Sequence, residues 1–146
     1  MNQNVPSPGN QGVADTTNYN GVIFALAERN QTDDPDGLGA GIYVSTPIQN
    51  SNALGVRLFV TTTSSTTGTL TVKIQNQDPV SRDWFDLPSA TTVAINDPAD
   101  VIFTLYPGVT VAANTDLSNH LGMTWRVHAT VGTAAVTFSI GAVYLG

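Results

Sequence analysis

A strict alternation of apolar and polar residues in the last third of the chain restricts its possible folds more than any other feature. Within the segment 125–131 every second residue is apolar: Trp125, Val127, Ala129 and Val131 alternate with Arg126, His128 and Thr130. The segment 136–140 alternates in the same way. Because successive side chains of a strand point to opposite faces, this period predicts two strands that each bury one face.

Two segments further upstream, 56–61 and 70–75, repeat this pattern. Their apolar positions are Val56, Leu58 and Val60 in the first and Leu70, Val72 and Ile74 in the second. The segment 64–68 between them reads Ser-Ser-Thr-Thr-Gly, a composition that is typical of a turn. We therefore predict that the two strands form a β-hairpin and share one apolar face.

Shorter strands are expected in the remaining chain, at 41–46, 83–87, 91–95 and 101–106. Residues 19–28 suit a strand at 22–24 and a helix at 25–27, and we interpret the whole segment as a strand. Strands that recur about every 8–12 residues, without a convincing helix, are typical of two packed sheets. The predicted fold class is all-β: an antiparallel β-sandwich of the jelly-roll or immunoglobulin-like type.

The chain of 146 residues is long enough to bury one core without disulfides, and it contains no cysteine. We expect a single β-sandwich domain at 19–146 and an extended N-terminal arm at 1–18. The arm is rich in Asn, Gln, Pro and Gly, and its only branched apolar residues are Val5 and Val13. Such a segment buries too little apolar surface to order alone. It is either disordered or becomes ordered on a neighbouring subunit.

Charge is sparse: charged residues make up 11% of the chain, and the net charge is −6. Five scattered cations do not form the basic stripe that nucleic acid or an anionic membrane requires, so we expect neither partner. A polar surface with few charges is easily desolvated, which favours contact with other proteins.

The first residues lack the basic segment and apolar core of a secretory signal peptide, and no apolar run in the chain reaches about 20 residues. We therefore expect synthesis in the host cytoplasm.

The residues for metal or catalytic chemistry are incomplete. Asp33, Asp34 and Asp36 precede a glycine as in a calcium loop, but Tyr43 stands where the distal glutamate of that loop belongs. No nucleophile elbow, zinc-binding helix or phosphate loop accompanies the two histidines. We therefore expect no enzyme, no cofactor and no metal. An aromatic platform at Trp84 or Trp125 leaves a carbohydrate-binding module as an alternative.

Three segments carry a resemblance to a known family. The first is 72–84, where an Asp-Pro-Val-Ser turn precedes the aromatic pair Trp84 and Phe85. The second is 105–110 with Tyr-Pro-Gly, and the third is 124–128 with Trp-Arg-Val, followed by a closing hairpin at 136–142. In order and spacing they resemble the β-sandwich head decoration, or capsid cement, proteins of tailed phages.

This resemblance implies a homotrimer that binds the major capsid protein on the outer surface of the expanded head and clamps neighbouring capsomers. The expected contacts are the arm, the acidic loop and the turn and strand near residue 84: Val5, Pro6, Val13, Asp33, Asp34, Asp36, Arg82, Trp84 and Phe85. A structural protein of the phage tail, neck or fibre is the nearest alternative, because one fold serves many sites.

Overall fold

The structure is a computed structural model, and it describes residues 20–64, 67–87, 93–95, 99–112 and 115–146. Within these ranges the chain forms eleven strands and no helix. They are β1 (Asn20–Arg29), β2 (Ile42–Val44), β3 (Ile48–Gln49), β4 (Gly55–Ser64), β5 (Thr69–Gln77), β6 (Trp84–Asp86), β7 (Val93–Ile95), β8 (Ala99–Leu105), β9 (Asp116–Leu117), β10 (Thr124–Gly132) and β11 (Val136–Leu145). The interpretation of residues 19–28 as a strand is confirmed over the described part.

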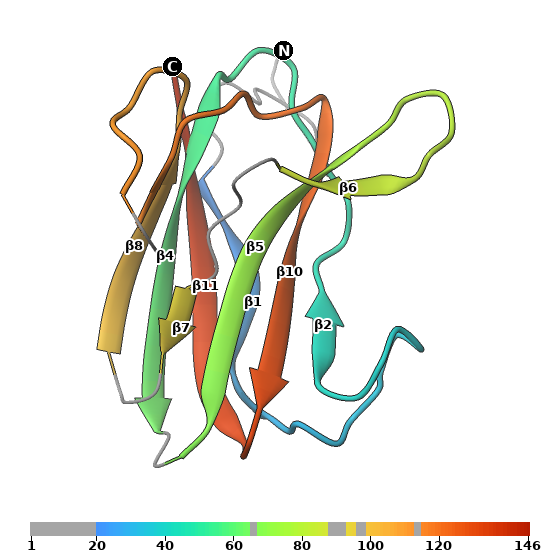
Figure 1. The fold of residues 1–146 in the computed structure, drawn as a ribbon, viewed down its shortest axis with the longest axis vertical. Coiled ribbons are helices and arrows are strands. Elements are labelled where there is room, and N and C mark those ends of the chain that lie inside the picture. The colour runs from blue at the N-terminus through green and yellow to red at the C-terminus, as the bar shows by residue number, and fades with distance from the viewer. Residues whose placement is uncertain (1–19, 65–66, 88–92, 96–98, 113–114) are drawn as a thin grey trace, which may run out of the picture.

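Two sheets stack face to face (Figure 1). Sheet A has the strand order β1-β11-β4-β8-β9, and sheet B has the order β2-β10-β5-β6, with β3 added to β10 and β7 to β5. Strands that follow one another in the chain mostly lie in opposite sheets, as β1 and β2, β4 and β5, and β10 and β11 do. This winding is that of a jelly roll, so the predicted all-β sandwich is confirmed and its type is decided.

The predicted hairpin between 56–61 and 70–75 is wrong. Strand β4 pairs with β11 and β8 in sheet A, whereas β5 pairs with β10 in sheet B. The closing hairpin is wrong for the same reason, because β10 and β11 also belong to different sheets. Alternation identifies the buried face of a strand but not its neighbour, and a short connection can cross from one sheet to the other. The two apolar faces therefore meet across the core.

The core lies between the sheets and consists of the alternating residues predicted for it. Trp125, Phe103 and Phe138 are its largest fully buried side chains. The indole Nε1 of Trp125 donates to the Tyr144 hydroxyl at 3.1 Å, and that hydroxyl donates to the Gln49 carbonyl at 2.7 Å. Both polar groups are thereby satisfied inside the sandwich, as burial requires.

The acidic loop at 30–41 is attached to the edge of sheet B at its base. The Gly41 amide donates to the Asp33 carbonyl at 2.6 Å, and the Gly41 carbonyl accepts from the Val131 amide at 2.8 Å. Gly41 has a φ of 77°, and a Cβ there would run into the Val131 carbonyl. Only glycine meets both conditions, so this residue fixes where the loop leaves the sheet.

Candidate protein-binding surfaces

A line of apolar side chains crosses the outward face of sheet A. Val22 of β1 and Phe59 of β4 both pair with Gly141 of β11, and Phe59 pairs with Ile102 of β8. Residues directly opposite in antiparallel strands point to the same side, so these four positions form one row, which we call the apolar row. Its side chains are 72%, 41% and 51% exposed at Val22, Phe59 and Ile102.

The two rows beside the apolar row are mostly uncharged, apart from one acid and one base. The neighbouring register row contains Ser139, Thr61 and Asp100, and the row on the other side contains Val143, Arg57 and Thr104. Arg57 donates from Nε to the Thr104 hydroxyl at 3.3 Å. A flat, mostly neutral face with large exposed apolar side chains has the composition found at the centre of protein–protein interfaces.

The outward face of sheet B is polar and internally connected. Asp86 accepts from Lys73 at 2.9 Å and from the amide of Gln75 at 2.8 Å. Gln75 in turn accepts from Arg126 Nε at 2.7 Å, and the guanidinium carbon of Arg126 lies 4.2 Å from the ring centre of Trp84. Three strands, β6, β5 and β10, are joined by this network.

The network determines the titration of its members. Burial alone raises the pKa of Asp86, but the hydrogen bonds from Lys73 and Gln75 lower it below its usual value. Burial and the nearby positive charges of Lys73 and Arg126 lower the pKa of His128, and Asp86 opposes this only in part. Its Nδ1 is buried without a hydrogen-bond partner among the described residues. The face therefore favours the neutral form of His128 by lowering its pKa.

Each carboxylate of the acidic loop already accepts a hydrogen bond. Asp34 accepts from the Gly39 amide at 3.0 Å, Asp33 from the Tyr43 hydroxyl at 3.4 Å, and Asp36 from the Val44 amide at 3.4 Å. The three groups are thus directed to different partners. Over the described part of the chain, no group of three or more His, Cys, Asp or Glu side chains could hold a metal ion.

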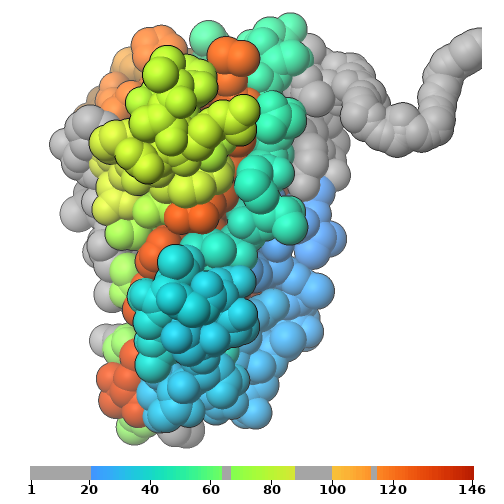
Figure 2. Space-filling view, turned by 90° about the vertical axis from the view of Figure 1, so that its right-hand side faces the viewer, coloured from blue at the N-terminus to red at the C-terminus, as the bar shows by residue number. Residues whose placement is uncertain are grey.

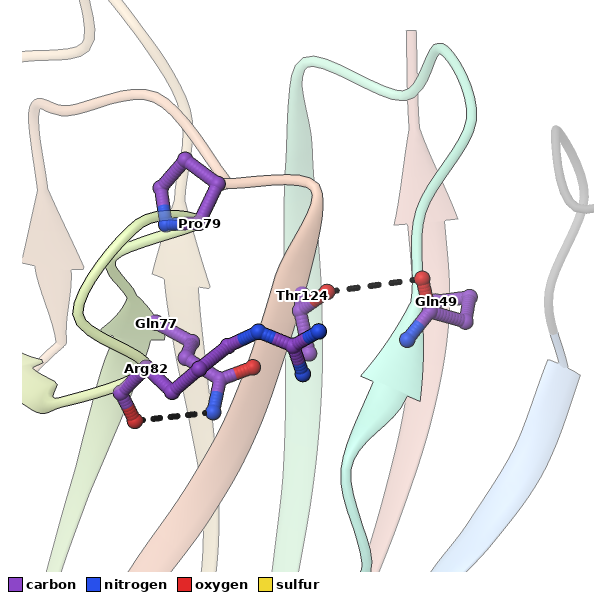
Figure 3. Close-up of a pocket in the computed structure, with 5 residues that line it drawn as sticks. All are labelled: Gln49, Gln77, Pro79, Arg82 and Thr124. Atoms are coloured by element: carbon purple, nitrogen blue, oxygen red, sulfur yellow. Dashed lines mark hydrogen bonds between the residues drawn. The ribbon is translucent and has the colours of Figure 1, made fainter.

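A cavity of about 290 Å³ opens beside the turn that joins β5 to β6 (Figure 3). Its lining consists of Gln49, Gln77, Pro79, Arg82 and Thr124. The Arg82 side chain extends across it toward Thr124, whose hydroxyl donates to Gln49 Oε1 at 3.4 Å. The turn at 78–83 and the acidic loop protrude from the same side of the molecule, and part of β10 is visible between them (Figure 2).

Comparison with known proteins gives little further information. No protein-family model matches the chain, and no curated protein matches it. Among solved structures, a chain of infectious bursal disease virus, Gt strain, has a TM-score of 0.45 and 15% identity, covering 88% of this chain and 31% of that one. A chain of the Gx strain has a TM-score of 0.47 and 12% identity, with coverages of 97% and 36%. This chain spans about a third of each, and similarity this low supports no inference about function.

The structure brings together only part of the predicted contact set. Val5, Pro6 and Val13 lie outside the described residues. Arg82 and Trp84 lie near each other beside the cavity end of sheet B, whereas Phe85 pairs with Asn76 and points to the opposite side from Trp84. The three aspartates lie on the other protrusion (Figure 2).

Sequence reasoning missed the apolar row. Its three side chains come from β1, β4 and β8, which are far apart in the chain, and only the register of sheet A aligns them. One signal was present: Phe59 interrupts the polar face of a strand whose other face is Val56, Leu58 and Val60. A large aromatic side chain on the outward face of a strand is unusual enough to indicate a contact surface.

No described helix is long and apolar enough to cross a membrane.

Proposed function

We propose that this protein is a structural protein of a virus particle: a decoration protein that binds the outer surface of an expanded phage head. In this proposal it acts as a homotrimer on the major capsid protein. The apolar row on sheet A is the observation that carries it, since three large apolar side chains there are left in water by the isolated chain. The family resemblance of segments 72–84, 105–110 and 124–142 supplies the kind of partner.

The physical chemistry of the row suits a broad protein surface. Burying exposed apolar area is favourable by roughly 25 cal/mol per Å², and few charged groups near the row must lose their water. A trimer would present three such rows, so modest affinities would combine through effective concentration. Binding that favours the expanded shell stabilises that shell by linkage. The arm at 1–18 would add a second contact to the shell or to a sister subunit.

Two alternatives are weaker on specific grounds. A carbohydrate-binding role would use Trp84 as a platform, but the guanidinium of Arg126 already covers one face of that ring. A place in the tail, neck or fibre would use the same fold, and the number of copies per particle separates it from a decoration role. We do not propose catalysis: Asp86, Lys73 and His128 belong to a network on the outward face of a sheet.

The test is sedimentation of the protein with purified expanded heads that lack it. We expect Phe59→Asp and Ile102→Asp to reduce binding at least about tenfold, a difference of about 1.4 kcal/mol. Val111→Asp is the matched control, because Val111 is also apolar and is 56% exposed, but lies outside the row. Equal binding by all three variants and the wild-type protein would exclude the row as the contact.

The arm is tested in the same assay. A variant without residues 1–18 should remain folded and bind the heads more weakly. Full binding by this variant would remove the arm from the proposal and leave the row as its basis.

A further inference from the structure

Arg82 differs from the other four cations of the chain. Lys73 pairs with Asp86, and the remaining three arginines donate hydrogen bonds: Arg29 to the carbonyls of Ala25, Ala27 and Phe138, Arg57 to Thr104, and Arg126 to Gln75. The guanidinium of Arg82 has no hydrogen-bond or ion-pair partner among the described residues. Among the five cations of this acidic chain, Arg82 thus lies beside a cavity without a partner in the described part of the structure.

The backbone at Arg82 is held in a conformation that a side chain disfavours. Its φ is 68°, in the left-handed region where glycine is the usual residue. Hydrogen bonds fix it there: the Arg82 amide donates to the Asp78 carbonyl at 2.9 Å, and Gln77 Nε2 donates to the Arg82 carbonyl at 2.9 Å. Strain of this kind is commonly retained where the side chain has a function.

The rest of the turn is also rigid. The Asp78 carboxylate accepts from the Val80 amide at 3.0 Å and from the Ser81 hydroxyl at 2.8 Å, and the Ser81 hydroxyl accepts from the Asp83 amide at 3.1 Å. These bonds to Asp78 lower the pKa of its carboxyl group. The Asp78 carboxylate is therefore engaged within the turn, and Arg82 is presented on a preorganised support.

The cavity offers hydrogen-bond donors in front of this guanidinium. Arg82 supplies a planar fork, and the Gln49 Nε2 group has no partner among the described residues. The Thr124 hydroxyl bonds to Gln49 Oε1 only at 3.4 Å, so it is able to turn toward a better acceptor. A guanidinium group beside uncharged donors is the arrangement that binds a carboxylate with two parallel hydrogen bonds.

Exposed apolar residues next to the lining residues in the chain indicate where this carboxylate comes from. Val80 follows the lining residue Pro79 and is 88% exposed, and Met123 precedes the lining residue Thr124 and is 72% exposed. A small free acid or an acidic sugar would leave both in water. A protein surface would cover them, and an arginine bordered by apolar residues is a common centre of protein interfaces.

We propose that the cavity beside Arg82 is a receptor for an aspartate or glutamate side chain that projects from the apolar surface of a neighbouring protein. The carboxylate accepts from the Arg82 fork and from Gln49, and apolar residues beside it pack on Val80 and Met123. The identification of this neighbour as a component of the virus particle rests on the proposed function. The argument from the chemistry of the cavity is independent of it.

The experiment is an NMR titration of the isotope-labelled full chain with the blocked peptide Leu-Asp-Leu, followed through the Arg82 Nε–H and Gln49 side-chain amide signals. The control peptide is Leu-Asn-Leu. We expect saturable shifts with the aspartate peptide and at least about tenfold weaker binding of the asparagine peptide. Arg57→Gln removes a cation elsewhere and should bind normally, which excludes general charge attraction.

Arg82→Gly is the decisive variant. Glycine accepts the left-handed backbone, so this variant should be at least as heat-stable as the wild-type protein and should not bind the aspartate peptide. Binding by Arg82→Gly equal to wild type, or equal binding of the two peptides, would overturn the proposal. Glucuronate that produces the same shifts at lower concentration than the peptide would assign the cavity to acidic sugars and would also overturn it. The titration needs no virus heads, so failure of the proposed function would leave its outcome unchanged.

Discussion

The buried Tyr144 hydroxyl connects the core to the strand that borders the Arg82 cavity. It accepts from Trp125 Nε1 at 3.1 Å and donates to the Gln49 carbonyl at 2.7 Å. Tyr144→Phe removes both bonds while leaving the ring in place. We expect this single oxygen to contribute measurably to stability, because Trp125 is fully buried and its indole N–H is shielded from solvent.

The magnitude follows from the two groups that lose a partner. An unsatisfied buried donor costs about 1–3 kcal/mol, and the Trp125 indole becomes one. The Gln49 carbonyl belongs to a residue that is exposed and can bind water, so its loss adds at most about 1 kcal/mol. The sum is a decrease of about 1–4 kcal/mol in the free energy of unfolding, or roughly 3–20 °C in the melting temperature.

Urea denaturation followed by Trp fluorescence measures this change. Tyr106→Phe is the matched control, since Tyr106 is half-buried and its hydroxyl has no hydrogen-bond partner among the described residues. The control should change the free energy of unfolding by less than about 0.5 kcal/mol. A Tyr144→Phe value as small as that of the control would refute the reasoning, and so would an equally large loss in both variants.

Two further predictions concern His128 and Gly41. The folded pKa of His128 lies below its unfolded value of about 6.5, so the unfolded chain binds more protons and stability falls as pH drops below about 6.5. His128→Gln should flatten that slope in urea titrations between about pH 5 and pH 7, and an unchanged slope would assign it to other groups. Gly41→Ala should lower the free energy of unfolding by about 2–4 kcal/mol through its φ of 77° and the contact with the Val131 carbonyl. Gly37→Ala shares the positive φ but meets open space, so it should lose only about 1 kcal/mol, and equal losses would contradict the steric argument.

Alternation along the chain was sufficient to predict the long strands β4, β5, β10 and β11 and their buried faces, whereas the two-residue strands β3 and β9 were not predicted. The segment 125–131 forms most of β10, and its four apolar residues are all in the core. Pairing could not be read in this way. A connection as short as that between β10 and β11 suits either a hairpin or a crossing between sheets, and only packing of the two apolar faces against each other decides.

The candidate surfaces were predictable only where one segment carries them. Arg82 and Trp84 stand two residues apart next to a turn signal, and both were expected to form contacts. The polar network that joins Trp84 to Arg126 and Gln75 spans three strands, so no local pattern indicates it. The apolar row depends in the same way on register in sheet A, which places Phe59 opposite Ile102.

The number of copies of this protein in the virus particle tests the central claim most directly. Quantitative mass spectrometry of purified virions would measure the chain against the major capsid protein. A decoration protein that occupies the outer surface of the head predicts a ratio close to one. A ratio of a few per cent would place the protein in the neck, tail or fibre, and absence from the particle would contradict a role as a virion protein.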